Sequence, residues 1–95
     1  MDFVKDVKNG DAQLVDVRSK LEWKIGHAKG ATHISLDKLA GGYTGDLDSN
    51  RPVYVYCASG ARSAQAESML RGRGFKVTNI GGLNNWVQAG GETER

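Results

Sequence analysis

The one cysteine of this 95-residue chain, Cys57, lies where a strand is expected to end and a helix to begin. The apolar run Val53–Tyr56 before it is typical of a buried strand, and residues 64–71 after it are typical of a helix. The first N–H groups of a helix have no partner within the helix, and they carry the positive end of its dipole. A thiol at this point is stabilised as a thiolate, the nucleophilic form of cysteine.

The residues that follow Cys57 would surround its sulfur atom. We predict that the backbone N–H groups of residues 58–62 form an anion-binding cradle, in which Gly60 allows the backbone to curl. Arg62 is expected either to contact an anionic substrate or to tie the loop to an acidic neighbour. Ser63 is expected either to donate a hydrogen bond to the sulfur or to cap the helix. The predicted catalytic residue and its loop are, in order, Cys57, Ala58, Ser59, Gly60, Ala61, Arg62 and Ser63.

Two charged residues accompany another expected strand, the run Leu14–Val17. Asp16 lies inside this run, and a carboxylate in an apolar strand is normally paired with another group. Arg18 follows two residues later and therefore points to the same face. We expect Asp16 and Arg18 to support the active loop rather than to act in catalysis. Ser19 and Glu22 have the spacing of a capping box, and Glu22 is also expected to pair with a basic group.

Expected strands alternate with expected helices along the chain, which predicts an α/β fold. The sheet should be small and mainly parallel, with about four or five strands and helices on both faces. In such sheets the binding crevice lies beyond the carboxyl ends of the strands, where Cys57 is placed. Gly74 is expected to end the long helix in a left-handed conformation, with Leu70 and Phe75 in contact. We expect one domain over residues 1–95, with residues 91–95 as a frayed tail.

Composition limits the function classes. The net charge of +2, with no block of Lys or Arg, gives no argument for nucleic acid and suits a small anionic substrate. A single cysteine forms no internal disulfide, and with His27 and His33 it makes no plausible metal site. No run of apolar residues is long enough to span a membrane. We expect a cytoplasmic, soluble protein with no metal, no cofactor, and no membrane or nucleic-acid partner.

Four segments resemble, in the right order, parts of the rhodanese family of sulfurtransferases. They are the strand ending in Asp-x-Arg at Leu14–Arg18, the turn at Gly26–Ala31, the loop at Cys57–Arg62, and the closing strand, double glycine and last helix at Asn79–Trp86. The resemblance covers roughly residues 3 to 90. The chain departs from the family pattern at Ala58, where many thiosulfate-using relatives carry a basic residue, and at Lys29, which replaces a proline.

The resemblance implies covalent sulfur transfer through Cys57. Its thiolate would take the outer sulfur of a donor such as thiosulfate, and the persulfide would pass that sulfur to cyanide or to a thiol, including a protein thiol. A free thiol with a pKa of about 8.5 is only a few per cent ionised at pH 7. We therefore expect the pKa of Cys57 to be lowered. Ala58 removes one expected contact with a thiosulfate anion, and Arg62 remains to hold its charge.

Two other function classes stay open. One is a non-catalytic interaction module with the rhodanese fold, against which the presence of Cys57 and its loop argues. The other is a small cysteine phosphatase or arsenate reductase. Those enzymes place arginine six positions after the cysteine, whereas here that position is Ser63 and the arginine, Arg62, comes five positions after it.

Overall fold

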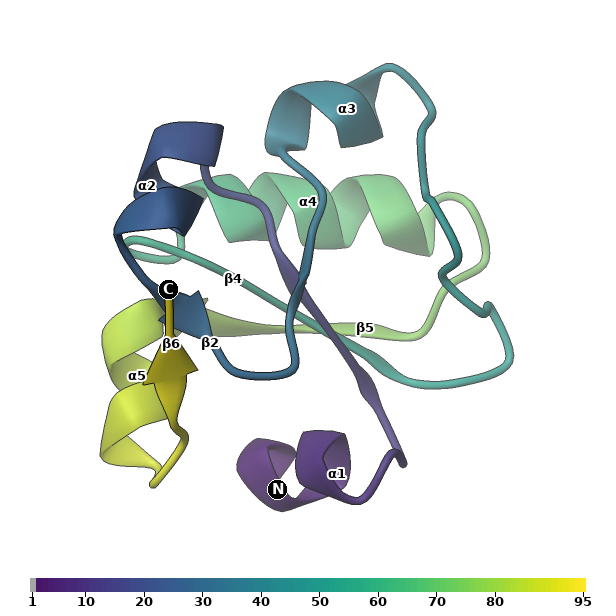
Figure 1. The fold of residues 1–95 in the computed structure, drawn as a ribbon. Helices are drawn as coiled ribbons and strands as arrows, with labels where there is room; N and C mark the ends of the chain where they lie inside the picture. Colours follow the sequence, from purple (N-terminus) through teal and green to yellow (C-terminus); the bar gives the residue numbers. More distant parts are fainter. Residues whose placement is uncertain (1) are drawn as a thin grey trace.

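The computed structural model describes residues 2–95 and arranges them in five helices and six strands (Figure 1). In chain order these are α1 (Phe3–Lys8), β1 (Gln13–Asp16), α2 (Lys20–Ile25), β2 (His27–Ala28), β3 (Thr32–His33), α3 (Leu36–Ala40), β4 (Val53–Cys57), α4 (Ala61–Arg71), β5 (Val77–Gly82), α5 (Leu83–Gln88) and β6 (Thr93–Glu94). No helix within these residues is long and apolar enough to cross a membrane.

Four strands form one sheet in the order β3-β1-β4-β5, and every neighbouring pair in it is parallel. The predicted small, mainly parallel sheet is therefore confirmed. In the register of β1 and β4, Asp16 lies opposite Tyr56, so that Cys57 is the next residue along β4. The carboxyl ends of the central strands thus bring the Asp16 region and Cys57 to the same edge of the sheet.

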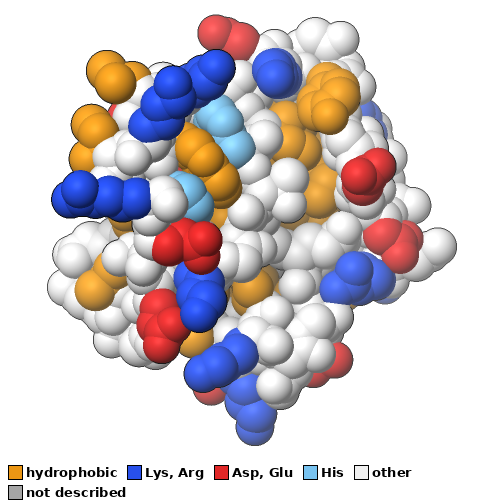
Figure 2. All heavy atoms as spheres, in the orientation of Figure 1, with side chains coloured by type: hydrophobic (Ala, Val, Ile, Leu, Met, Phe, Trp, Pro, Cys, Tyr) orange, Lys and Arg blue, Asp and Glu red, His pale blue; other side chains and the backbone are white. Residues whose placement is uncertain are grey.

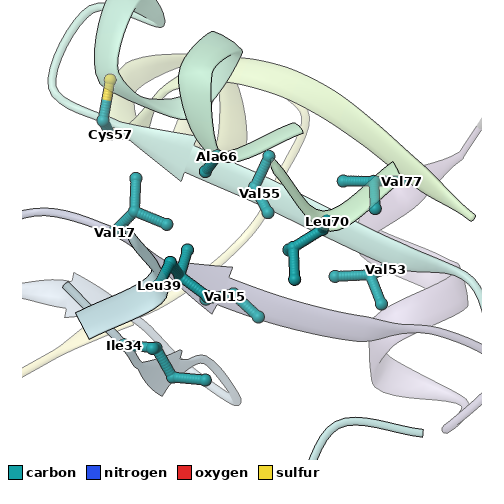
Figure 3. Packing of buried hydrophobic residues seen from close by; sticks show 10 residues of the cluster. All are labelled: Val15, Val17, Ile34, Leu39, Val53, Val55, Cys57, Ala66, Leu70 and Val77. Carbon is teal, nitrogen blue, oxygen red and sulfur yellow. The ribbon is translucent and has the colours of Figure 1, made fainter. Parts of the chain in front are cut away.

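Helices cover both faces of this sheet, as the sequence predicts. Side chains of β4 alternate between two buried clusters, with Val53, Val55 and Cys57 in one and Tyr54 and Tyr56 in the other. Helices α3 and α4 lie over the first face, and α1 and α5 lie over the second (Figure 1). Cys57 stands at the end of the first cluster, and its sulfur points away from the aliphatic side chains (Figure 3).

Two predicted helix ends are confirmed. Ser19 and Glu22 form a reciprocal capping box at the start of α2. After α4, Gly74 has a φ of +91°, and the Phe75 N–H donates to the Leu70 carbonyl at 3.1 Å, which is the Schellman pattern.

The end of the chain differs from the expected frayed tail. Residues 93–94 form β6, which pairs with β2 in antiparallel orientation. The Glu92 carbonyl accepts hydrogen bonds from the Trp86 side chain at 2.7 Å and from the Lys29 N–H at 2.9 Å. These bonds order residues 91–94, because the tail supplies partners for a buried indole and for the backbone of the β2 turn.

Candidate active site

The loop after β4 is shorter than the sequence suggested, because α4 begins at Ala61 rather than at residue 64. Gly60 occupies the position before the helix with a φ of +102°, a conformation that glycine adopts without strain. Ser63 therefore lies in the first turn of α4, and the expectation that it could cap the helix is wrong. Ala58, Ser59 and Ala61 are exposed.

The loop packs directly on the backbone of β5. A Cβ atom on Gly82 would collide with the Ala58 carbonyl oxygen, and one on Gly60 would lie 3.3 Å from the Gly81 Cα atom. Gly81 and Gly82 are the last residues of β5. They lie beyond an irregularity at which the partner of β4 changes from Asn79 to Gly81.

Hydrogen-bond donors converge on the Cys57 sulfur. The Gly60 N–H donates to Sγ at 2.9 Å, and the Ser63 hydroxyl oxygen lies 3.4 Å from Sγ. Cys57 is fully buried, at 0% exposure. The sulfur is thus shielded from water and yet faces polar groups that stabilise an anion.

These contacts shift the pKa of Cys57. Burial alone would raise it, because a charged thiolate is poorly solvated in the interior. Hydrogen bonds from the Ser63 side chain and from the backbone N–H groups of Ser63, Gly60 and Ser59 outweigh burial, and they lower the pKa from 9.0 to about 7. Of the predicted N–H groups of residues 58–62, those of Ser59 and Gly60 contribute to this shift. The N–H group of Ser63, which lies outside the predicted range, also contributes.

Arg62 forms a two-pronged ion pair with Glu22 of α2. The distances are 2.7 Å from Nη1 to Oε1 and 2.9 Å from Nη2 to Oε2. The hydrogen bond from Arg62 is the main reason that the pKa of Glu22 falls to about 2. Of the two roles expected for Arg62, the structure contains the tie to an acidic neighbour, with both side chains still about one-third exposed.

Asp16 and Arg18 form the expected buried pair, with 2.8 Å between Arg18 Nη2 and Asp16 Oδ2. The Tyr56 hydroxyl donates to the same Asp16 oxygen at 2.6 Å, and Arg18 Nη2 donates to the Gly26 carbonyl at 2.6 Å. The pair therefore holds the residue before Cys57 and the end of α2. These hydrogen bonds go to Tyr56 and Gly26, so any support that the pair gives to residues 58–62 is indirect.

Asn79 was not identified from the sequence as a site residue. Its Nδ2 donates to the Gly60 carbonyl at 3.0 Å, and its Oδ1 accepts from the Ser63 hydroxyl at 2.7 Å and from the Gly81 N–H at 2.8 Å. The available signal was a lone amide side chain in a strand that runs toward the cysteine loop.

The two histidines lie close together over α2, on either side of a hydrophobic side chain (Figure 2). Trp23 stacks on His27 with 3.4 Å between ring centroids and on His33 with 5.1 Å. Each histidine also has a ring nitrogen within hydrogen-bond distance of a backbone carbonyl. Within residues 2–95, no group of three or more His, Cys, Asp or Glu side chains could hold a metal ion.

Comparison with known proteins identifies the family of this site. A family model described as rhodanese-like domain matches residues 2–89. The thiosulfate sulfurtransferase GlpE of Coxiella burnetii (strain RSA 493 / Nine Mile phase I) is 35% identical over 82 residues, covering 84% of this chain and 76% of GlpE. The uncharacterized protein YqhL of Bacillus subtilis (strain 168) is 38% identical over 77 residues, or 79% of this chain. A tRNA sulfurtransferase of Desulfurococcus amylolyticus is 37% identical over 87 residues, or 90% of this chain. The chain spans only 60% of YqhL and 17% of the tRNA sulfurtransferase.

Solved structures share the same fold. The Alr3790 protein from Anabaena sp. matches with a TM-score of 0.83 and 31% identity, covering 97% of this chain and 76% of that one. A rhodanese-related protein from Thermoplasma volcanium matches with a TM-score of 0.83 and 26% identity, covering 98% of this chain and 91% of that one. With a family match over residues 2–89 and a cysteine loop at the carboxyl edge of its sheet, this chain belongs to the rhodanese-like domain family.

Proposed function

We propose that the protein transfers sulfane sulfur from thiosulfate or a persulfide donor to cyanide or a thiol. The observation that carries the proposal is the Cys57 sulfur, which is held by the Gly60 N–H and has a pKa of about 7. About half of the protein would then carry a thiolate at neutral pH, compared with a few per cent for an ordinary thiol. The proposal is supported by the similarity to the thiosulfate sulfurtransferase GlpE.

The reaction has two displacements at sulfur. In the first, the Cys57 thiolate attacks the outer sulfur of thiosulfate, an S–S bond forms, and the donor S–S bond breaks so that sulfite leaves with the electron pair. In the second, cyanide or a thiolate attacks the outer sulfur of the persulfide, and the Cys57 thiolate leaves. The first step leaves a persulfide anion at the site, and the same N–H groups would stabilise it.

Arg62 supplies a positive charge beside the loop. Its guanidinium is bound by Glu22 but remains partly exposed, and its pKa is raised mainly by that carboxylate. Because Ala58 offers no charge, Arg62 is the cation of the loop that can attract an anionic donor. We infer the reducing cytoplasm as the location, since a free thiol persists there.

The first test is mass spectrometry of the protein after incubation with thiosulfate. The expected result is a gain of about 32 Da, one sulfur atom, which is lost again on addition of cyanide. A Cys57→Ser variant provides the control and should show no gain. If neither thiosulfate nor any persulfide donor yields the gain, the proposal fails and the result favours an interaction module. If the protein hydrolyses an aryl phosphate through Cys57, it is a phosphatase and the proposal fails.

A further inference from the structure

The Ser63 hydroxyl faces three acceptors but carries one proton. Its oxygen lies 2.7 Å from Asn79 Oδ1 and 3.4 Å from both Cys57 Sγ and the Gly81 carbonyl oxygen. While Cys57 is a neutral thiol, the shorter contact to Asn79 is the stronger one. Once the thiolate forms, a hydrogen bond to its full charge is stronger than one to a neutral amide oxygen. The Ser63 hydroxyl can thus switch its hydrogen bond from Asn79 Oδ1 to the sulfur as Cys57 ionises.

Asn79 also holds the other side of the loop. It lies opposite Val55 in the β4–β5 register, and its side chain therefore projects on the same face of the sheet as those of Val55 and Cys57. From there Nδ2 reaches the Gly60 carbonyl at 3.0 Å. This bond and the one from the Ala64 N–H, also 3.0 Å long, hold Gly60 through its carbonyl, while the Gly60 N–H points at the Cys57 sulfur 2.9 Å away.

Asn79 is itself firmly placed. Its backbone N–H donates to Glu67 Oε2 of α4 at 2.8 Å, and its Oδ1 accepts the Gly81 N–H at 2.8 Å. The Gly81 bond leaves Oδ1 with a partner when the Ser63 proton turns away. Asn79 Oδ1 can therefore lose the hydrogen bond from Ser63 without becoming an unsatisfied buried acceptor.

We propose that Asn79 is a positioning residue for Cys57, which keeps the Gly60 N–H on the sulfur and holds the Ser63 proton until the thiolate forms. The inference rests on the proposed function only in that it assigns Asn79 to the same site. It concerns the ionisation of Cys57, and it can be tested without any sulfur donor.

The test is a pH titration of the Cys57 thiolate by its ultraviolet absorbance, which reports on one thiol because the chain has one cysteine. The background is Ser63→Ala, since a Ser63 hydroxyl freed from Asn79 would donate to the sulfur and offset the loss. In that background, Asn79→Leu keeps a similar side-chain size and loses every side-chain hydrogen bond. We expect the midpoint to rise by about one pH unit, a tenfold loss of thiolate well below the midpoint.

Asn85→Leu in the same background is the matched control. Asn85 Nδ2 donates to the Ile80 carbonyl at 2.9 Å, so this variant also removes an asparagine bond to β5 and leaves the loop untouched. Its midpoint should equal that of Ser63→Ala. The proposal is overturned if Asn79→Leu leaves the midpoint in place, or if Asn85→Leu raises it equally.

A measurement on the unmodified protein covers the case in which Asn79→Leu does not fold. The side-chain amide signals of Asn79 in a nitrogen-15 NMR spectrum should shift with the Cys57 midpoint, because Oδ1 gives up the Ser63 proton. Signals of Asn79 that stay constant through the titration would overturn the proposal. If the thiosulfate mass gain is absent and the Asn79 effects are present, the proposed function fails and this inference stands.

Discussion

At the scale of single residues, the site depends on a balance at one sulfur atom. Burial of Cys57 opposes ionisation, and hydrogen bonds from Ser63, Gly60 and Ser59 favour it strongly enough to lower the pKa to about 7. The balance places the change of charge within the physiological pH range.

The pH dependence of sulfur loading follows from this pKa. In the proposed reaction the thiolate is the attacking form, and its fraction falls tenfold per pH unit below the midpoint. We therefore expect the initial rate of loading from thiosulfate to rise with pH, with a midpoint of about 7 and a plateau above it. Stopped mass-spectrometric time courses would measure the rate. A midpoint at or above about 8.5, the value of a free thiol, would contradict the role of the converging donors.

Variants of Arg62 and Glu22 can distinguish two roles of Arg62, the attraction of an anionic donor and the structural support that the ion pair provides. Arg62→Ala removes the guanidinium, and Glu22→Gln removes the negative charge of the ion pair but keeps the cation. Both variants should lower the free energy of unfolding by about 1 kcal/mol or less, since the pair is partly exposed. We expect loading by thiosulfate to fall roughly tenfold for Arg62→Ala and much less for Glu22→Gln. Equal losses of loading would make Arg62 purely structural.

At the scale of elements, the loop is a short bridge between β4 and α4 that lies on the backbone of β5. Gly60 allows both the short connection and its close packing on β5, because it has a left-handed φ and lies close to Gly81. The loop is thus shaped by the strand beneath it as much as by its own residues.

Gly60→Ala should both destabilise the fold and impair sulfur loading. A left-handed alanine is disfavoured by about 1–2 kcal/mol, and its Cβ would lie 3.3 Å from the Gly81 Cα atom. Gly10→Ala is the control, because Gly10 has a φ of +78° and nothing within 4 Å of a Cβ. Urea unfolding should show a larger loss for Gly60→Ala, and loading should fall in that variant alone. A normal rate in Gly60→Ala would count against the Gly60 N–H as a stabilising donor.

Sequence patterns predicted the elements whose signals are local. Apolar runs marked β1 and β4, the capping box marked α2, and Gly74 with Phe75 marked the end of α4. The start of α4 was missed, because glycine before a helix provides no side-chain cap and Ala61 with Arg62 gives no boundary signal. Within the site, Cys57 followed from its place in the chain. Asn79 did not, because its reach to Gly60 depends on the irregular register of β4 and β5.

At the scale of the whole molecule, the first and last thirds of the chain meet through β2 and β6. Two-residue strands have no periodicity, so this long-range pairing leaves no mark in the sequence. The pairing lies beside Trp86, whose indole donates to the Glu92 carbonyl, on the side of the sheet opposite the sulfur.

A chain that ends at Gly91 should be less stable than the full chain and keep the ionisation of Cys57. The truncation removes the Glu92 carbonyl and leaves the Trp86 indole N–H and the Lys29 N–H without their partner. We expect a loss of about 1–3 kcal/mol in the free energy of unfolding. Glu92→Ala, which retains the carbonyl, is the control and should lose far less. An unchanged stability on truncation would restore the idea of a frayed tail.

The exposed positions of the cysteine loop have a consequence for how such proteins diversify. Ala58, Ser59 and Ala61 are exposed, whereas three of the four donors that stabilise the sulfur anion are the backbone N–H groups of Ser63, Gly60 and Ser59. Mutation alters side chains and leaves peptide groups in place. A lineage can therefore exchange these three outer positions to recruit new reactants, and its anion-holding chemistry is inherited intact.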